Sequence, residues 1–369
     1  MLRKAFLAIT CLACFFFIAV QVWATSFEYS AAKELGTYAT NQAAKDLDTK
    51  WNPENCIALT NAGYARPNGQ SSLGCLDGIA AQSKATPGQG TLIRLQSRFD
   101  QPLWFAFYAR KSGQCAYYQL EADKAAQALS NKQSLTPSLF TRKDTARIDA
   151  DFLFAHSQKF QNQAQKGLFG SNLFRVVTVA NAADRNCPDY VLTALQVHDH
   201  YCPGVSSGLM LTAYTQEYIL KSSPQTECFV LSINPWCKED ALITLLNATP
   251  GKKGYGVLYP TEKEVTSWPK PLNQVDTVVF TQENNDQAWH GWLLGFDFDR
   301  ARQMQDLPKF DSVVVDKLAA DRWFLDRLDR PEKFVSVLKE VELEDGASPR
   351  DLLKPGSNPV HILADMPAY

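Results

Sequence analysis

The sequence predicts an α+β fold built from two tandem copies of one module, with mixed or antiparallel sheets. A repeated turn is the first observation behind this prediction. Residues 85–90 read Ala-Thr-Pro-Gly-Gln-Gly, and residues 248–254 read Ala-Thr-Pro-Gly-Lys-Lys-Gly. The second observation is a cysteine ahead of each turn at nearly the same distance, Cys75 in the first copy and Cys237 in the second. Self-similarity of this kind is the signature of an internal repeat.

Each copy shows the same order of local patterns: helix, strand, helix and hairpin. Segments rich in Ala, Leu, Thr and Gln predict the helices, and short apolar segments predict buried strands. The Thr-Pro-Gly turn ends the second helix, and Asn, Asp and Gly are typical of hairpin tips. The predicted elements, first copy before second, are helices at 30–47 and 205–221, strands at 56–60 and 228–233, second helices at 76–84 and 238–247, and hairpins around the turns 111–114 and 284–287.

These elements predict four parts of the chain. Residues 1–24 form a signal peptide, 25–165 a degenerate first module, 170–300 the second module, and 301–369 a helical and extended C-terminal tail. The stretch that joins the copies reads as mostly helix plus connector. A chain of this length exceeds what one core usually supports, so two domains are expected. We expect the two copies to pack against each other as an intrachain pseudo-dimer.

The N-terminus has the layout of a secretory signal peptide. Arg3 and Lys4 precede an apolar run over residues 5–22, and Ala24 fits the small residue before a cleavage site. An uncleaved membrane anchor and a lipoprotein processed at Cys14 are the alternatives, although the apolar run continues past that cysteine. The sequence therefore predicts a periplasmic or secreted protein with no membrane span after signal cleavage.

Composition excludes one class of partner and leaves others open. The formal net charge is −2 and becomes more negative once Arg3 and Lys4 are removed, so no basic field for nucleic acid is expected. The partner is an unknown protein or small molecule. No phosphate loop occurs. The mature chain would carry an odd number of cysteines, so at least one is free, metal-bound or paired between chains.

The run His198-Asp199-His200-Tyr201-Cys202-Pro203-Gly204 contains the densest group of metal-binding residue types. In an extended segment residues i, i+2 and i+4 face the same side, so His198, His200 and Cys202 would converge. Pro203 suits the first position of a helix. Cys202 would then lie at a helix N-terminus, where the helix dipole favours the thiolate.

Cys237 is expected to add a further ligand, because it too precedes a predicted helix. Asp240, one turn into that helix, could bond a ligand histidine or bind the metal itself. Nitrogen and sulfur donors of this kind suit zinc or another divalent transition metal. The alternatives are a disulfide between Cys202 and Cys237, and a nucleophilic Cys202 activated by His200.

The first copy is an internal control for this site. It keeps Cys75 and Asp77 but has no His-x-His-x-Cys run. If both copies fold alike, the histidines are not needed for folding, whereas part of the role of Cys237 and Asp240 is structural. His290, on the return strand of the second hairpin, could complete the site, line a pocket, or be an ordinary strand residue.

These motifs resemble the FmdE family, which takes its name from formylmethanofuran dehydrogenase. The resemblance rests on His198 to Gly204 at a helix start, on Cys237-Lys238-Glu239-Asp240-Ala241, and on the turn Thr249-Pro250-Gly251-Lys252. It covers about residues 187–298, and 27–120 more weakly through the repeat. It implies an α+β core that binds a metal through the motif histidine and cysteine, commonly as a dimer. Carried over, it points to His200, Cys202 and Cys237, supported by His198 and Asp240.

Two departures from the family pattern limit what the resemblance implies. No cysteine follows Cys237, so the C-terminal zinc finger of many members is absent, and Ala248 stands where relatives often have a cysteine. Three hypotheses about function therefore remain: a metal-binding carrier or accessory factor, an enzyme using metal-bound water or the Cys202 thiolate, and a haem or tetrapyrrole binder. The enzyme hypothesis expects a pocket with aromatic walls, with Trp289, Trp292 and Tyr259 as candidates.

Overall fold

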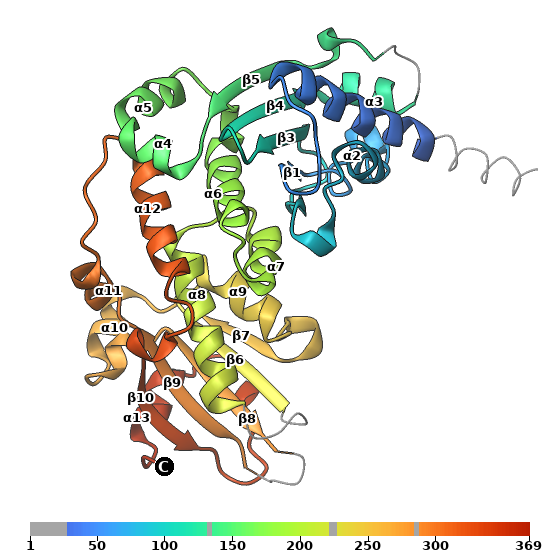
Figure 1. The fold of residues 1–369 in the computed structure, drawn as a ribbon. Helices are drawn as coiled ribbons and strands as arrows, with labels where there is room; N and C mark the ends of the chain where they lie inside the picture. The colour runs from blue at the N-terminus through green and yellow to red at the C-terminus, as the bar shows by residue number, and fades with distance from the viewer. Residues whose placement is uncertain (1–27, 131–134, 221–226, 284–287) are drawn as a thin grey trace, which may run out of the picture. The chain divides into compact units, whose positions relative to one another are not determined.

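A computed structural model describes residues 28–130, 135–220, 227–283 and 288–369. The chain divides into two compact units. The first runs to Leu153 and includes Asn162–Asn186, and the second comprises Phe154–Gln161 and Cys187–Tyr369. Each unit holds one five-stranded sheet with its own helices (Figure 1). The predicted signal peptide and the predicted turn 284–287 lie outside the described residues.

The sheet of the first unit has the strand order β2-β1-β3-β4-β5. Strand β1 pairs in parallel with β2 and antiparallel with β3, and the remaining neighbours are antiparallel. Its core combines side chains of the sheet with those of the helix at residues 28–46. The strands are β1 (Cys56–Thr60), β2 (Leu92–Arg94), β3 (Leu103–Ala109), β4 (Gln114–Leu120) and β5 (Arg142–Arg147).

The sheet of the second unit has the order β7-β6-β8-β9-β10. Strand β6 pairs in parallel with β7 and antiparallel with β8, and β9 lies between β8 and β10 in antiparallel register. The strands are β6 (Glu227–Ile233), β7 (Tyr255–Leu258), β8 (Thr277–Gln282), β9 (His290–Phe296) and β10 (Val335–Glu342).

The two sheets match strand for strand, which confirms an α+β fold with two similar modules. In both, the first strand of the module in sequence, β1 or β6, takes a parallel edge strand on one side and an antiparallel meander on the other. The helix–strand–helix–hairpin prediction was incomplete, because each module has two further strands. Strands β2 and β7 follow the Thr-Pro-Gly turns, and β5 and β10 extend the hairpins. Strand β5 lies in the joining segment, which was predicted as mostly helix plus connector and contains α3, α4, α5 and α6 besides this strand.

Helices of the first unit lie between and after its strands. The helix at 28–46 agrees with the predicted 30–47. The others, with the short 3-10 turns, are η1 (Pro67–Gly69), α2 (Cys75–Ser83), η2 (Pro87–Gln89), α3 (Ala122–Leu129), η3 (Pro137–Leu139), α4 (Ala150–Ala155), α5 (Ser157–Gln165), η4 (Gly170–Asn172) and α6 (Leu173–Asp184). Of these, α5 and the end of α4 fall largely within Phe154–Gln161, which belongs to the second unit.

The second unit carries the helices that hold the candidate site. Helices α7 (Asp189–His198), α8 (Pro203–Tyr214) and α9 (Lys238–Leu245) pack on one another. A π-helical turn, η5 (Thr215–Ile219), continues α8. The remaining elements are η6 (Pro250–Lys252), α10 (Glu262–Ser267), η7 (Leu272–Gln274), α11 (Phe298–Met304), α12 (Val313–Leu325), η8 (Pro331–Lys333), η9 (Pro349–Leu353) and α13 (Pro359–Asp365).

Glycines let α8 approach the start of α9 closely. A Cβ on Gly208 would lie 2.3 Å from the Lys238 carbonyl oxygen, and one on Gly204 would lie 2.8 Å from the Cys237 Cβ. The first unit has a similar close contact at a glycine. A Cβ on Gly36 would lie 2.1 Å from the Cys75 carbonyl oxygen. Close backbone approach is a recurrent use of glycine. In both units it brings a cysteine at a helix start against a neighbouring helix.

Across the part of the chain that the structure describes, no helix is both long enough and apolar enough to span a bilayer.

Candidate metal centre

Four side chains from three helix ends converge in the second unit. His198 ends α7, His200 lies in the following turn, Cys202 caps α8, and Cys237 caps α9. Their donor atoms all lie within 4.8 Å of one another. The group therefore unites the His-x-His-x-Cys run with a cysteine from a distant part of the sequence.

The convergence of the two histidines depends on a turn and corrects the extended conformation predicted from the sequence. Asp199 caps α7 in the left-handed conformation, with a φ of 71°. This reverses the chain at the helix end, so that the rings of His198 and His200 lie 4.2 Å apart between centroids. The sequence signal for α7 was present, because Val191, Leu192 and Leu195 follow helical spacing and are buried.

Cys202 and Pro203 occupy the positions predicted for them. Cys202 has extended backbone at the N-cap of α8, and Pro203 is the first helical residue. The Sγ of Cys202 lies 3.9 Å from Nε2 of His198. Cys237 takes the N-cap position of α9 and lies within hydrogen-bond reach of His198, His200 and Cys202.

Each histidine is oriented by a carboxylate. His198 Nδ1 is 2.7 Å from Asp240 Oδ2, and His200 Nδ1 is 2.8 Å from Asp199 Oδ1. The Nε2 atom of each ring is thereby left to face the thiols. Carboxylate–histidine pairs of this kind are typical of metal sites, where they fix the ring and its tautomer. Asp240 is thus a partner of His198, the first of its two predicted roles, and Asp199 is a site residue that was not predicted from the sequence.

Burial and mutual contact shift the protonation of the group. Burial disfavours the charged form of His198, but bonds to Asp240 and Cys237 outweigh it and raise the pKa of His198 to about 9. Contacts with Cys202, His198 and His200 lower the pKa of Cys237 well below the ordinary thiol value. The Cys202 pKa is raised, first by its bond to Cys237 and then by burial. These shifts favour a Cys237 thiolate beside a protonated His198.

A buried ion pair holds the start of α9 against the end of β6. Lys238 and Glu239 lie 2.7 Å apart and are almost fully buried. Glu239 accepts hydrogen bonds from the Ser232 hydroxyl and the Trp236 backbone N–H, and Lys238 Nζ donates to the Ile233 carbonyl oxygen. These bonds fix the loop on either side of Cys237.

The donor set fits a tetrahedral metal. Two imidazole nitrogens and two thiols form the Cys₂His₂ set of many zinc sites, whose donor atoms lie roughly 3.3–3.8 Å apart. The observed limit of 4.8 Å leaves only a small contraction to reach that spacing. The seven cysteines of the described residues are all free, so Cys202 and Cys237 do not form a disulfide in this structure.

The first unit lacks this arrangement, as its sequence predicts. Cys75 begins α2, is fully buried, and has its pKa raised by burial. Asp77 accepts a hydrogen bond from the Tyr29 hydroxyl at 2.7 Å, whereas Asp240 partners a histidine. The cysteine and the aspartate therefore have structural partners where no histidine is present.

His290 does not join the four converging residues. It begins β9, where it lies 3.4 Å from Glu342 and packs edge-on against Tyr369 with ring centroids 4.9 Å apart. Tyr259 is 72% exposed, and Trp289 lines a small separate hollow of about 210 Å³. The aromatic walls expected from the sequence are thus not those of a pocket at the metal centre.

Comparison with known proteins identifies the segment that contains the site. Residues 197–314 match the family model described as "FmdE, Molybdenum formylmethanofuran dehydrogenase operon". The match includes all four converging residues and begins next to His198. The first unit lies outside the match. A search of the curated proteins finds no match to the chain.

Proposed function

From the premise that residues 197–314 carry an FmdE domain, we propose that this protein is an exported metal-binding protein, a carrier or accessory factor that holds zinc. The observation that carries the proposal is the convergence of His198, His200, Cys202 and Cys237 within 4.8 Å. Their carboxylate partners support it, because a metal-binding histidine almost always donates its other ring N–H to a group of this kind.

Zinc is favoured over other metals by the chemistry of the donors. Thiolate and imidazole ligands suit zinc and other borderline ions, whereas calcium and magnesium prefer oxygen. A bound zinc ion would act as a Lewis acid, or as a structural or transported ion. His198 and His200 would bind through Nε2, Cys202 and Cys237 as thiolates, with Asp240 and Asp199 holding the rings.

The test is elemental analysis of purified protein beside four single variants. We expect about one zinc per chain in the wild type, and loss of that metal in Cys202→Ala and His200→Ala. Cys228→Ala and His361→Ala are matched controls, because both residues lie outside the converging group and should leave the metal content unchanged. Metal-free wild-type protein after purification in zinc would refute the proposal.

The disulfide alternative gives a different result in the same preparation. A Cys202–Cys237 bond would remove two thiols from a count made in denaturant without reductant. It would also exclude metal until the protein is reduced. The haem alternative predicts a Soret band on addition of haem that is lost in His200→Ala.

Export is a separate part of the proposal and rests on the N-terminal sequence. Signal cleavage predicts a mature chain that begins at Thr25 in the periplasm or medium. Mass spectrometry of the isolated protein checks this. An intact N-terminus in the membrane fraction would favour the anchor, and a lipid-modified Cys14 would favour the lipoprotein.

A second candidate function, a metal-dependent enzyme, is favoured by one observation. Pro203 and Trp236, the immediate neighbours of Cys202 and Cys237, line a cavity of about 970 Å³. A substrate there would lie next to the thiols. An enzyme of this kind needs a coordination position open to substrate or water. Four protein ligands on the metal, measured by X-ray absorption spectroscopy, would exclude that mechanism.

A further inference from the structure

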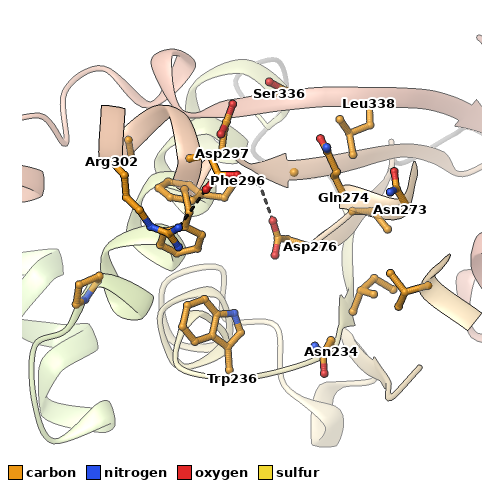
Figure 2. Close-up of a pocket in the computed structure, with 18 of the residues that line it drawn as sticks. Asn234, Trp236, Asn273, Gln274, Asp276, Phe296, Asp297, Arg302, Ser336 and Leu338 are labelled. Carbon is orange, nitrogen blue, oxygen red and sulfur yellow. Dashed lines mark hydrogen bonds and ion pairs between the residues drawn. The ribbon is translucent and has the colours of Figure 1, made fainter. Parts of the chain in front are cut away.

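The cavity beside the metal centre has the size of a small-molecule site. Its volume of about 970 Å³ is at the upper end of the range usual for ligand pockets, and all of its lining residues belong to the second unit. Figure 2 shows that side chains of separate elements surround it, among them Trp236, Asp276, Asp297 and Arg302. The chemistry of these side chains indicates what the cavity can hold.

One wall of the cavity is aromatic. The ring of Trp236 lies 5.6 Å from that of Phe298, which in turn meets Phe296 edge-to-face at 4.6 Å. Trp236 is 46% exposed, although large aromatic side chains are usually covered. Aromatic faces attract organic cations through the ring quadrupole as well as apolar groups through burial.

Asp276 brings a half-buried carboxylate to the same cavity (Figure 2). Its Oδ2 accepts a hydrogen bond from the Phe296 backbone N–H at 2.7 Å. Among the described residues no further hydrogen bond reaches this carboxylate, so Oδ1 is left for a ligand. Burial raises the pKa of Asp276, with partial compensation from the Phe296 bond and from Lys238. A cation beside Oδ1 would relieve this desolvation.

The charges around the cavity leave it negative. Asp276, Asp297 and Asp299 line it with a single cation, Arg302, which is paired with Asp299 at 3.1 Å. Asp297 accepts the Arg300 backbone N–H at the start of α11 and has no charged partner among the described residues. Lys238 is near Asp276, but its charge is offset by Glu239 at 2.7 Å.

We propose that this cavity binds a small organic cation, an amine with an apolar or aromatic body. The ammonium group lies against Asp276, and the body lies against the Trp236, Phe298 and Phe296 rings. The site uses none of the four metal-binding residues, so it stands independently of the proposed zinc.

Isothermal titration of the full chain with three matched probes tests the charge requirement. The probes are phenethylamine, the neutral 2-phenylethanol and the anionic 3-phenylpropionate. We expect the amine to bind at least about tenfold more tightly than the alcohol, because the ammonium adds a charge-assisted hydrogen bond, and the acid not to bind. Equal affinity for amine and alcohol would overturn the proposal, and so would the absence of binding by all three at millimolar concentration.

Variants locate the site. Asp276→Asn keeps an acceptor for the Phe296 N–H but removes the charge, and we expect it to lose the preference for the amine. Trp236→Leu alters a half-exposed side chain and should weaken amine binding without unfolding the protein. Asp345→Asn, an exposed carboxylate outside the cavity, is the matched control. Unchanged amine binding in both Asp276→Asn and Trp236→Leu would refute the assignment.

One further variant separates this proposal from that of the metal. Cys202→Ala is expected to lose zinc but to keep the preference for the amine. If the wild type proves metal-free and still binds the amine, only the metal proposal fails. If it holds zinc and shows no amine preference, only the cavity proposal fails.

Discussion

Asp199 is the residue on which the geometry of the histidine pair depends. It adopts the left-handed conformation at the end of α7, and its carboxylate lies 2.8 Å from the His200 ring. This backbone conformation is uncommon for residues other than glycine, although aspartate and asparagine tolerate it better than most. Asp199 therefore combines a turn with an orienting carboxylate. The sequence shows that the two histidines are separated by one residue, but it does not predict the turn that this residue forms.

Gly204 gives a prediction at the same scale. A Cβ there would lie 2.8 Å from the Cys237 Cβ and 3.0 Å from the Trp236 ring. Gly204→Ala should displace Cys237 from the other three ligands and lower zinc affinity by about tenfold or more, since overpacking costs of order 1–3 kcal/mol. Chelator competition measures this. Gly251→Ala is the control, because a Cβ there meets nothing within 4 Å. An equal affinity for zinc in both variants would contradict the prediction.

The pH dependence of zinc binding follows from the protonation of the group. Zinc requires a neutral His198 and two thiolates, so protons compete with the metal. Burial lowers the pKa of His198, but bonds to Asp240 and Cys237 outweigh it and hold that pKa at about 9, and the pKa of Cys202 is raised as well. Zinc affinity should therefore rise with pH through this range and beyond it. Competition with a chromophoric chelator across this pH range checks the slope. An affinity independent of pH would contradict it.

Asp240→Asn tests two effects of this carboxylate: it raises the pKa of His198, and it orients the His198 ring. Without its charge the pKa of His198 falls, so the part of the pH dependence that comes from His198 should move to a lower pH. At high pH the zinc affinity itself should be about 10–100-fold lower than in the wild type, because the ring loses its orienting partner. The same chelator titration measures both. Asp345→Asn should match the wild type in both respects, because that residue is exposed and outside the site.

At the scale of elements, the buried pair at the start of α9 fixes Cys237. Glu239→Gln keeps one acceptor oxygen but leaves Lys238 charged and almost fully buried. Breaking such a pair by removing one partner costs about 3–5 kcal/mol. We expect a loss of that order in the free energy of unfolding of the second unit, measured by chemical denaturation. Glu344→Gln, at an exposed position, should leave it unchanged. A loss below about 1 kcal/mol would show that the pair does not hold the loop.

The elements show where sequence reasoning succeeded and where it failed. Strand β1 was predicted at its observed bounds, and β6, α2 and α9 to within about two residues, because apolar strands and Pro-terminated helices are local signals. Strand β2 has only three residues, so the pairing with β1, rather than its own pattern, stabilises it. Strand β5 is rich in charge, and although its positions alternate regularly in exposure, only Ala146 is fully buried. Neither could be recognised without knowing its neighbour.

The candidate site was predictable in its residues but only partly in its arrangement. Residue type and proximity to predicted helices pointed to four ligands. The structure brings all four together: His198, His200, Cys202 and Cys237. The cavity was not foreseen. Asp276, Phe296 and Trp236 come together from three separate segments, and their joint position depends on the packing of α11 and the sheet.

For the whole molecule, metal binding should stabilise one unit only. The four ligands all belong to the second unit. A ligand at a hundred times its dissociation constant adds about 2.7 kcal/mol to the state that binds it. Hydrogen exchange should therefore slow in α7, α8 and α9 on addition of zinc, whereas β1, β3 and β4 of the first unit should not change. If zinc slowed hydrogen exchange equally in both units, the prediction that only the second unit is stabilised would be wrong. The intrachain pseudo-dimer stays a prediction, which small-angle scattering can test.

Strand β10 lies outside the segment that matches the family, although it belongs to the same sheet. The family match ends at residue 314, yet the sheet is completed by Val335–Glu342, and Phe154 from the joining segment stacks on Phe310 at 5.2 Å. A fragment cut at the limits of the match would leave β9 as an open edge, which invites aggregation between chains. We therefore expect a fragment limited to the match to carry the four ligands without the strand that completes their sheet.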